Sequence, residues 1–193
     1  MKTCDFMEIE LRAFISNKEA VVKKLKELGA VYEGGEHIVD NYYCPKNVDD
    51  FEDVAMGEVG SYSLRIRKVI NKHRYELNAK VIVRKGDHRA FGEFETRIGD
   101  PLQMNLILQA IGYKLFAIVD KKREVYRLGE ISINIEDIRD FRQAIELEII
   151  SDKKVREHKK KLRELMLKLG VRNKDFIKKS ITYEYLKEYA FKV

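Results

Sequence analysis

The segment MEIELR, residues 7–12, alternates apolar and charged side chains along its whole length. Successive side chains of a β-strand point to opposite faces, so the pattern predicts a strand with one apolar and one charged face. Glu8, Glu10 and Arg12 share the charged face. Carboxylates two residues apart on a strand lie about 6.6 Å apart, and their repulsion is relieved by a cation. The segment therefore predicts both a strand and a place for a positive ion.

The same alternation recurs along the chain and predicts a largely antiparallel sheet. In such sheets one face packs on the core and the other carries polar residues, which gives a period of two. A longer strand is expected over residues 116–126, where three basic residues fall close together. The other alternating segments are residues 64–67, 77–81, 93–95, 133–136 and 145–149.

Several of these strands carry charges of a single sign on their polar faces. A solvated sheet face accounts for any one such pair, but it does not account for the whole set, because ordinary polar faces mix residue types and place opposite charges across from each other. The acidic pairs are Glu8/Glu10, Glu93/Glu95 and Glu146/Glu148, and the basic pairs are Arg65/Arg67 and Lys121/Arg123.

A ligand made of a metal ion and a triphosphate accounts for the acidic and the basic strands together. Mg²⁺ and Mn²⁺ prefer carboxylate oxygens, and guanidinium groups match phosphate oxygens two at a time. A nucleoside triphosphate carries about four negative charges near neutral pH, so several basic side chains and a metal are needed to balance it. A nucleic-acid-binding protein would account only for the basic strands.

Helices are expected in four segments, from the signals at their ends. Ser16 and Glu19 form a capping box at the start of the first helix. Asp100 and Pro101 begin the second, because proline is favoured at the first helical position. The expected segments are residues 16–29, 100–112, 151–170 and 183–189, and the first three end at a glycine. If these helices cover the outside of a curved sheet, the charged faces point inward, and eight strands close into a barrel with a charged interior.

The composition agrees with a globular chain that binds an anion. A length of 193 residues is typical of a single domain. Of these residues, 45% are hydrophobic and 36% are charged. The formal net charge is +6, but 32 acidic residues accompany 38 basic ones, which is not the balance of a plain nucleic-acid-binding surface. There is no apolar run of the roughly 20 residues that a membrane span needs. We expect a cytoplasmic protein with no membrane partner.

The order of these motifs resembles that of the CYTH superfamily, the triphosphate tunnel metalloenzymes, which includes class IV adenylyl cyclases, thiamine triphosphatases and inorganic triphosphatases. Residues 8–12 (EIELR) resemble the E-x-E-x-K signature of that superfamily, and residues 64–67 (LRIR) resemble its L-R-x-R strand. The resemblance covers essentially the whole chain and is strongest to archaeal proteins like class IV cyclases. The further matching segments are residues 40–43 (DNYY), Lys80, residues 93–95 (EFE), residues 121–123 (KKR) with Tyr126, residues 146–148 (ELE) and residues 180–186 (SITYEYL).

The resemblance implies an α+β fold. This is a closed eight-stranded antiparallel β-barrel, the triphosphate tunnel, with helices packed on the outside. It also implies a single domain over residues 1–193, in which residues 151–193 form a helical extension packed on the barrel. The resemblance further implies that this chain uses Mg²⁺ or Mn²⁺ as its cofactor. It also implies a homodimer.

The resemblance also assigns roles to the charged residues, position by position. The residues implied for metal binding are Glu8, Glu10, Glu95, Glu136, Glu146 and Glu148. Those implied for binding the triphosphate are Arg12, Arg65, Arg67, Lys80, Lys121 and Arg123, with Glu8, Glu10 and Arg12 as the catalytic set.

Among the departures from the family's pattern, two concern predicted site residues. Arg12 stands where the signature has lysine, and a guanidinium stays protonated, so it can bind phosphate but cannot act as a base. Glu136 and Asp137 are alternatives for the acid that the family often places in the strand before the last acidic pair.

Two reactions fit these residues. The first is the cyclisation of ATP to cyclic AMP and pyrophosphate, which the length and the resemblance of residues 180–186 to the end of class IV cyclases favour. The alternative is hydrolysis of inorganic triphosphate, a nucleoside triphosphate or thiamine triphosphate. A non-catalytic polyphosphate- or RNA-binding protein is the third hypothesis, and it leaves the acidic pairs unexplained.

Overall fold

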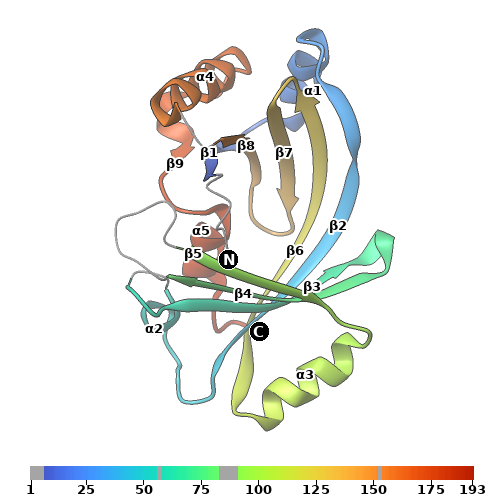
Figure 1. The fold of residues 1–193 in the computed structure, drawn as a ribbon, viewed down its shortest axis with the longest axis vertical. Helices are drawn as coiled ribbons and strands as arrows, with labels where there is room; N and C mark the ends of the chain where they lie inside the picture. Colours follow the sequence, from blue (N-terminus) through green and yellow to red (C-terminus); the bar gives the residue numbers. More distant parts are fainter. Residues whose placement is uncertain (1–6, 56–57, 83–90, 152–153) are drawn as a thin grey trace. The chain divides into compact units, whose positions relative to one another are not determined.

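The computed structural model describes residues 7–55, 58–82, 91–151 and 154–193, without the side chains of residues 7, 8 and 91. Helices pack on a sheet whose strand pairs are antiparallel, which is an α+β arrangement (Figure 1). The helices are α1 (Lys18–Glu27), α2 (Phe51–Val54), α3 (Pro101–Ala110), α4 (Val155–Lys168) and α5 (Ile181–Tyr189). The strands are β1 (Met7–Ile15), β2 (Val31–Pro45), β3 (Tyr62–Val69), β4 (Arg74–Ile82), β5 (Phe91–Arg97), β6 (Tyr113–Leu128), β7 (Ile131–Ile138), β8 (Gln143–Ser151) and β9 (Phe176–Ile177).

The nine strands form one sheet in the order β5-β4-β3-β2-β6-β7-β8-β1-β9. The prediction of a closed barrel of eight strands is therefore wrong for the part of the chain that the structure describes, where β5 and β9 stand at the two ends of the order. One reason lies at β1. Its first edge pairs with β8, and its second edge pairs with β9 at Arg12 and Ala13, where a closing strand would have to pair.

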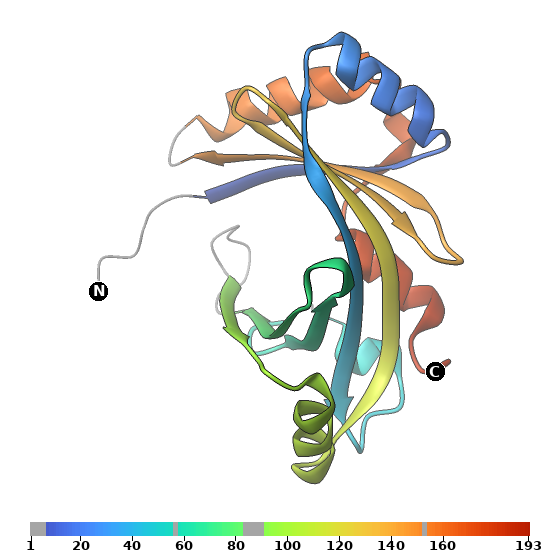
Figure 2. The same cartoon turned by 90° about the vertical axis from the view of Figure 1, so that its right-hand side faces the viewer.

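The chain divides into two compact units, and each is described by itself. The first unit comprises residues 1–35 and 122–181, and the second comprises residues 36–121 and 182–193. The two long strands β2 and β6 are neighbours in the sheet and each passes from one unit to the other (Figure 2). The predicted single domain over residues 1–193 stays a prediction.

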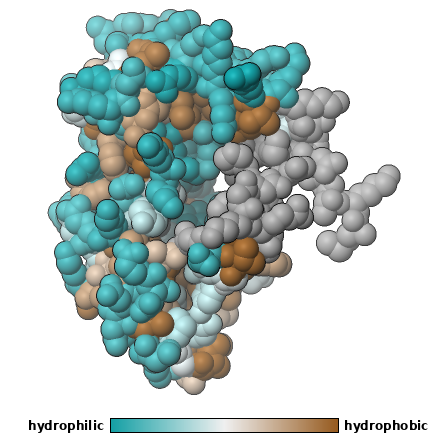
Figure 3. Space-filling model, turned by 90° about the vertical axis from the view of Figure 1, so that its left-hand side faces the viewer, coloured by the Kyte–Doolittle hydropathy of each residue, from teal (hydrophilic) through white to brown (hydrophobic). Residues whose placement is uncertain are grey.

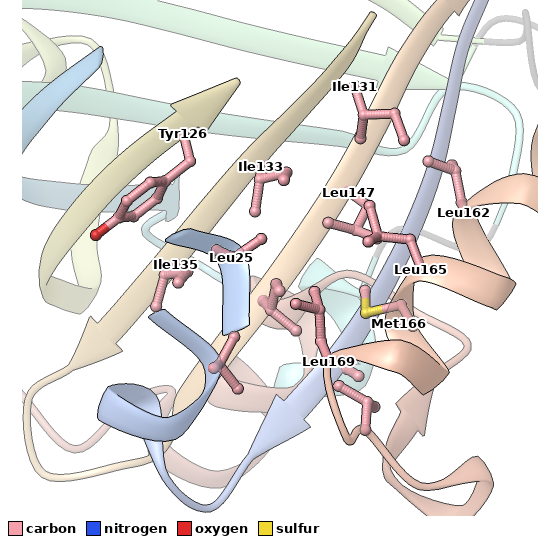
Figure 4. Packing of buried hydrophobic residues seen from close by; sticks show 14 of the residues in the cluster. Leu25, Tyr126, Ile131, Ile133, Ile135, Leu147, Leu162, Leu165, Met166 and Leu169 are labelled. Carbon is pink, nitrogen blue, oxygen red and sulfur yellow. The ribbon is translucent and has the colours of Figure 1, made fainter. Parts of the chain in front are cut away.

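The core of the first unit lies on the apolar face of β1, β7 and β8. Alternate residues of these strands, such as Ile9, Ile133 and Leu147, are buried there. Both α1 and α4 cover this face, with Leu25 from α1 and Met166 from α4 packed into the same cluster (Figure 4). Because strand side chains alternate, burying this face leaves the charged residues of the same strands on the opposite one.

A core cluster of the second unit follows the same rule. Leu108 of α3 packs on Ile66 of β3 and Tyr43 of β2, with Leu77 of β4 beside them. Ile66 stands between Arg65 and Arg67, so both arginines lie on the face that α3 does not cover.

The starts of α1 and α4 differ from the predictions, and the start of α3 agrees with its prediction. The predicted cap was Ser16, but the structure places Asn17 there, and its side chain accepts a hydrogen bond from the Ala20 amide at 2.8 Å. Asn and Ser are equally good caps, so the sequence pattern could not separate neighbours. Asp100 caps α3 as predicted. The predicted start of the third helix at residue 151 is too early, because β8 extends through Ser151.

The surface agrees with the charged composition. The face drawn in Figure 3 is mostly hydrophilic, with hydrophobic residues in separate spots. None of the helices in the described ranges has the length and apolar character that crossing a bilayer requires.

The packing of α4 predicts a contrast between two leucines of the same helix. Leu162 is 0% exposed, whereas Leu167 is 45% exposed. Replacing Leu162 with Ala should lower the free energy of unfolding by about 3 kcal/mol, because it leaves a cavity under the sheet. Leu167→Ala should lower it by less than about 1 kcal/mol. Urea unfolding followed by circular dichroism measures both, and equal losses would contradict the packing described for α4.

Candidate functional site

The charged face of the first unit brings together four of the predicted site residues. In the register of β1 and β8, Glu10 is opposite Glu148 and Arg12 is opposite Glu146. On the other side of β8, Asn134 of β7 is opposite Glu146. These five residues therefore lie side by side across three strands, on the face that α1 and α4 leave free.

Arg12 joins two of the predicted metal-binding carboxylates. Its Nε donates to Glu146 Oε2 at 2.5 Å, and its Nη2 forms an ion pair with Glu10. Burial alone would lower the pKa of the Arg12 guanidinium, but Glu146 and Glu10 together raise it above its usual value. Asn134 Nδ2 donates to the other Glu146 oxygen at 3.5 Å. The group is a line of donors and acceptors running from β1 to β7.

Glu136 rather than Asp137 lies on this charged face. It is two residues from Asn134 on β7, and the residue is 3% exposed. Arg123 of β6 donates to Glu136 Oε1 from Nε at 2.9 Å and from Nη2 at 2.5 Å. Alternation places Asp137 on the opposite face. The register therefore distinguishes two acids that the sequence left as alternatives.

Glu8 is the one predicted site residue whose side chain lies outside the described residues. Its backbone belongs to β1 and is opposite Ile150 of β8. The roles of Glu8 in catalysis and metal binding stay predictions.

The charged face of the second unit is organised around Asp40, a buried acid on β2. Arg67 donates to both Asp40 oxygens at 2.8 Å, and Arg65 Nη1 lies 3.6 Å from Oδ2. Asp40 is 0% exposed. Burial would raise its pKa, but the hydrogen bonds from Arg67 and the charges of Arg65, Arg67 and Lys121 hold it below the usual value. Asp40 is therefore ionised and anchors two predicted phosphate-binding arginines, with buried Lys121 adding its charge.

The central acidic pair also belongs to this face. Asn78 of β4 accepts from Arg65 Nε at 3.4 Å and donates to Glu95 Oε2 at 2.6 Å. Lys80 pairs with Glu93 at 2.5 Å, and their side chains are 44% and 59% exposed. Glu95, predicted as a metal-binding acid, lies in this unit, on the face that carries the arginines and separated from Arg65 by Asn78.

The sequence prediction missed several functional candidates. Asp40 was part of the quoted segment at residues 40–43, and its position opposite Arg67 would have marked it as an anchor if the register had been known. Tyr42, whose hydroxyl accepts from Arg65 Nη1 at 3.2 Å, lies in the same segment. Asn78 and Asn134 are neutral and gave no signal in a search for charged pairs.

The carboxylates of the first unit suit a hard divalent cation. Within the ranges that the structure describes, no three His, Cys, Asp or Glu side chains come close enough to hold a metal ion. Mg²⁺, however, is commonly held by one or two carboxylates together with phosphate oxygens and water. Glu10 and Glu146 both contact the guanidinium of Arg12, so two carboxylates of the type that Mg²⁺ binds already lie around one cationic group.

Known proteins resemble this chain in sequence and in fold. A protein of Methanocaldococcus jannaschii named "Putative adenylate cyclase" is 30% identical over 179 residues, which cover 90% of this chain and 95% of that protein. A conserved hypothetical protein of Pyrococcus furiosus has the same fold, with a TM-score of 0.71 at 25% identity over 92% of this chain and 98% of that one.

A third similar structure is that of a Hippeastrum protein, with a TM-score of 0.63 at 15% identity over 94% of both chains. That protein is described as an adenylyl cyclase candidate with a dominant triphosphatase activity, and its likeness to this chain is one of fold. The family model described as the CYTH domain matches residues 7–181, nearly the whole chain. This protein therefore belongs to the CYTH family.

Proposed function

We propose that this protein is a divalent-metal-dependent enzyme that acts on triphosphates, and that its reaction is the conversion of ATP to cyclic AMP and pyrophosphate. Proteins of the CYTH family bind triphosphates and use divalent metals. The observation that carries the proposal is the pairing of Arg65 and Arg67 around the buried Asp40, because it holds two guanidiniums on one face of the sheet. The name of the M. jannaschii relative favours the cyclase reaction over the alternative.

The second unit supplies the phosphate-binding side chains in this proposal. Arg67 is fixed by two hydrogen bonds to Asp40, and Arg65 is held by Tyr42 and Asn78. Side chains held in place lose little conformational freedom when they bind, which favours affinity. Lys80 and Lys121 are further phosphate ligands, and Arg123 has the same role from the first unit.

The proposed metal-binding side chains of the first unit are Glu10, Glu146 and Glu148, with Glu8 and Glu136 as further proposed ligands. Glu95 is a proposed ligand in the second unit. A bound Mg²⁺ or Mn²⁺ neutralises charge that builds up on phosphate oxygens during the reaction. Arg12 contributes a fixed positive charge and hydrogen-bond donors, and it takes no part as a base. Its role is electrostatic stabilisation of the leaving pyrophosphate.

Triphosphate hydrolysis is the second candidate function. The same phosphate-binding and metal-binding residues serve it, and the dominant triphosphatase activity described for the Hippeastrum protein favours it. A cytoplasmic location, a homodimer and the absence of a nucleic-acid partner stay predictions.

Product analysis separates these functions. The purified protein is incubated with ATP, inorganic triphosphate or thiamine triphosphate, with Mg²⁺ or Mn²⁺ and with EDTA as the control. We expect cyclic AMP and pyrophosphate from ATP, only when metal is present. Release of orthophosphate would favour the triphosphatase. The absence of any product, together with salt-sensitive binding that needs no metal, would leave only a binding protein.

Replacing Arg65 tests the phosphate-binding face and keeps the ion pair between Arg67 and the buried Asp40. Arg65→Gln should raise KM for the triphosphate substrate about tenfold to a hundredfold, as expected for a lost charge-assisted hydrogen bond. Arg67 still pairs with Asp40 in this variant, so folding should be preserved. Lys72→Gln is the matched control, because Lys72 pairs with Glu36 in the same unit and has no proposed role. An unchanged KM in Arg65→Gln would contradict the proposal.

The anchoring role of Asp40 predicts a dependence of stability on pH. A depressed pKa in the folded state means that Asp40 stabilises the fold fully above its ordinary value of 3.8, and that this contribution is lost as the pH falls below it. Asp40→Asn should therefore be less stable than the wild type by about 3 kcal/mol at pH 7, and the difference should shrink below that value. Denaturant unfolding of both proteins across this range measures it, and a constant difference would refute the role.

A further inference from the structure

Arg12 occupies the place that a cation would take between two carboxylates. Its guanidinium contacts Glu10 on its own strand and Glu146 on β8, through different nitrogen atoms. The two acids come from neighbouring strands, so no turn or shared backbone segment brings them together. The positive charge of Arg12 balances the repulsion between them.

Glu136, a buried acid of this face, is also neutralised by an arginine. Arg123 donates twice to Glu136 Oε1, and Glu136 is nearly inaccessible to solvent. Glu10, Arg12 and Glu146, in contrast, keep partly exposed side chains, with 35%, 19% and 19% of their side-chain surface accessible. An ion from solution could therefore reach every side chain of the Arg12 bridge, whereas the Glu136 carboxylate is covered, with 4% of its side-chain surface accessible.

We propose that Arg12 is a positioning residue that competes with the divalent cation for Glu10 and Glu146, and so sets how tightly this protein binds metal. The inference rests on the proposed function, because it takes these carboxylates as metal ligands. A metal ion draws on the same two carboxylates as the guanidinium, so in this proposal its binding weakens the contact with Glu10 or with Glu146. The free energy of that contact is subtracted from the metal's affinity.

The chemistry of arginine makes this competition stronger than it would be for lysine. A guanidinium offers several N–H donors in a fixed plane, so Nε and Nη2 can serve two carboxylates at the same time. A lysine has one nitrogen, which is strongly hydrated and mobile on its stem. Lysine at this position would hold the two acids less firmly, and a metal ion would displace it more easily.

A purely structural ion bridge is the alternative, and it makes the opposite prediction. If Arg12 only holds β1 and β8 together, its removal disorders Glu10 and Glu146, and metal affinity falls. If Arg12 competes with the metal, its removal leaves two unbalanced carboxylates, and metal affinity rises. The sign of the change therefore distinguishes the two roles.

The experiment measures Mn²⁺ binding by isothermal titration calorimetry in the absence of any phosphate. Arg12→Gln should bind Mn²⁺ about tenfold more tightly than the wild type, within the usual range of coupling between two sites. Arg12→Lys should lie between them. Arg127→Gln is the matched control, because Arg127 pairs with Glu33 elsewhere in the same unit, and its affinity should equal that of the wild type.

Thermal unfolding gives a second readout that does not depend on activity. Arg12→Gln should unfold at a lower temperature than the wild type without metal, and Mn²⁺ should raise its unfolding temperature by more than it raises that of the wild type. Equal or weaker Mn²⁺ binding by Arg12→Gln would overturn the inference while leaving the metal-dependent function standing. If none of the proteins bound Mn²⁺, the inference and the metal part of the proposed function would fail together.

Discussion

The structure depends on one constraint, which is that neighbouring side chains of a strand cannot share a face. Three helices bury the apolar faces, α1 and α4 in the first unit and α3 in the second. Every charged residue between the buried ones is then forced to the opposite side. The acids and bases gather on common faces because Ile9, Ile66 and Leu147 are buried, and no attraction among the charges is needed to place them there.

Gathering like charges on one face costs free energy, and each unit offsets that cost by pairing ions of opposite sign. Arg12 balances Glu10 and Glu146, while Asp40 balances Arg65 and Arg67. The two arrangements mirror each other, since one base lies between two acids in the first unit and one acid lies between two bases in the second. Each face suits a ligand of opposite charge. The face with two acids suits a cation, and the face with two bases suits a polyanion.

Local features of the fold could be predicted from the sequence, and non-local ones could not. The alternation in residues 7–12 and 64–67 predicted strands, and Asp100 with Pro101 predicted the start of α3, because these signals lie within a few residues. The predicted closure failed because it depends on which edges pair, and the two-residue strand β9 has no periodicity to detect. The choice between Glu136 and Asp137 and the partner of each arginine likewise depend on strand register, which one strand's pattern does not contain.

The short strand β9 affects how the protein behaves when its C-terminal part is removed. Phe176 and Ile177 pair with the edge of β1 that does not contact β8, at Ala13 and Arg12. β1 is the strand that carries the acidic pair Glu8/Glu10. An uncovered strand edge presents unpaired amide and carbonyl groups to other chains. A chain shortened before residue 176, or cut by a protease after α4, would expose this edge. Self-association through β1 would then compete with folding, so these two residues protect solubility as well as shape.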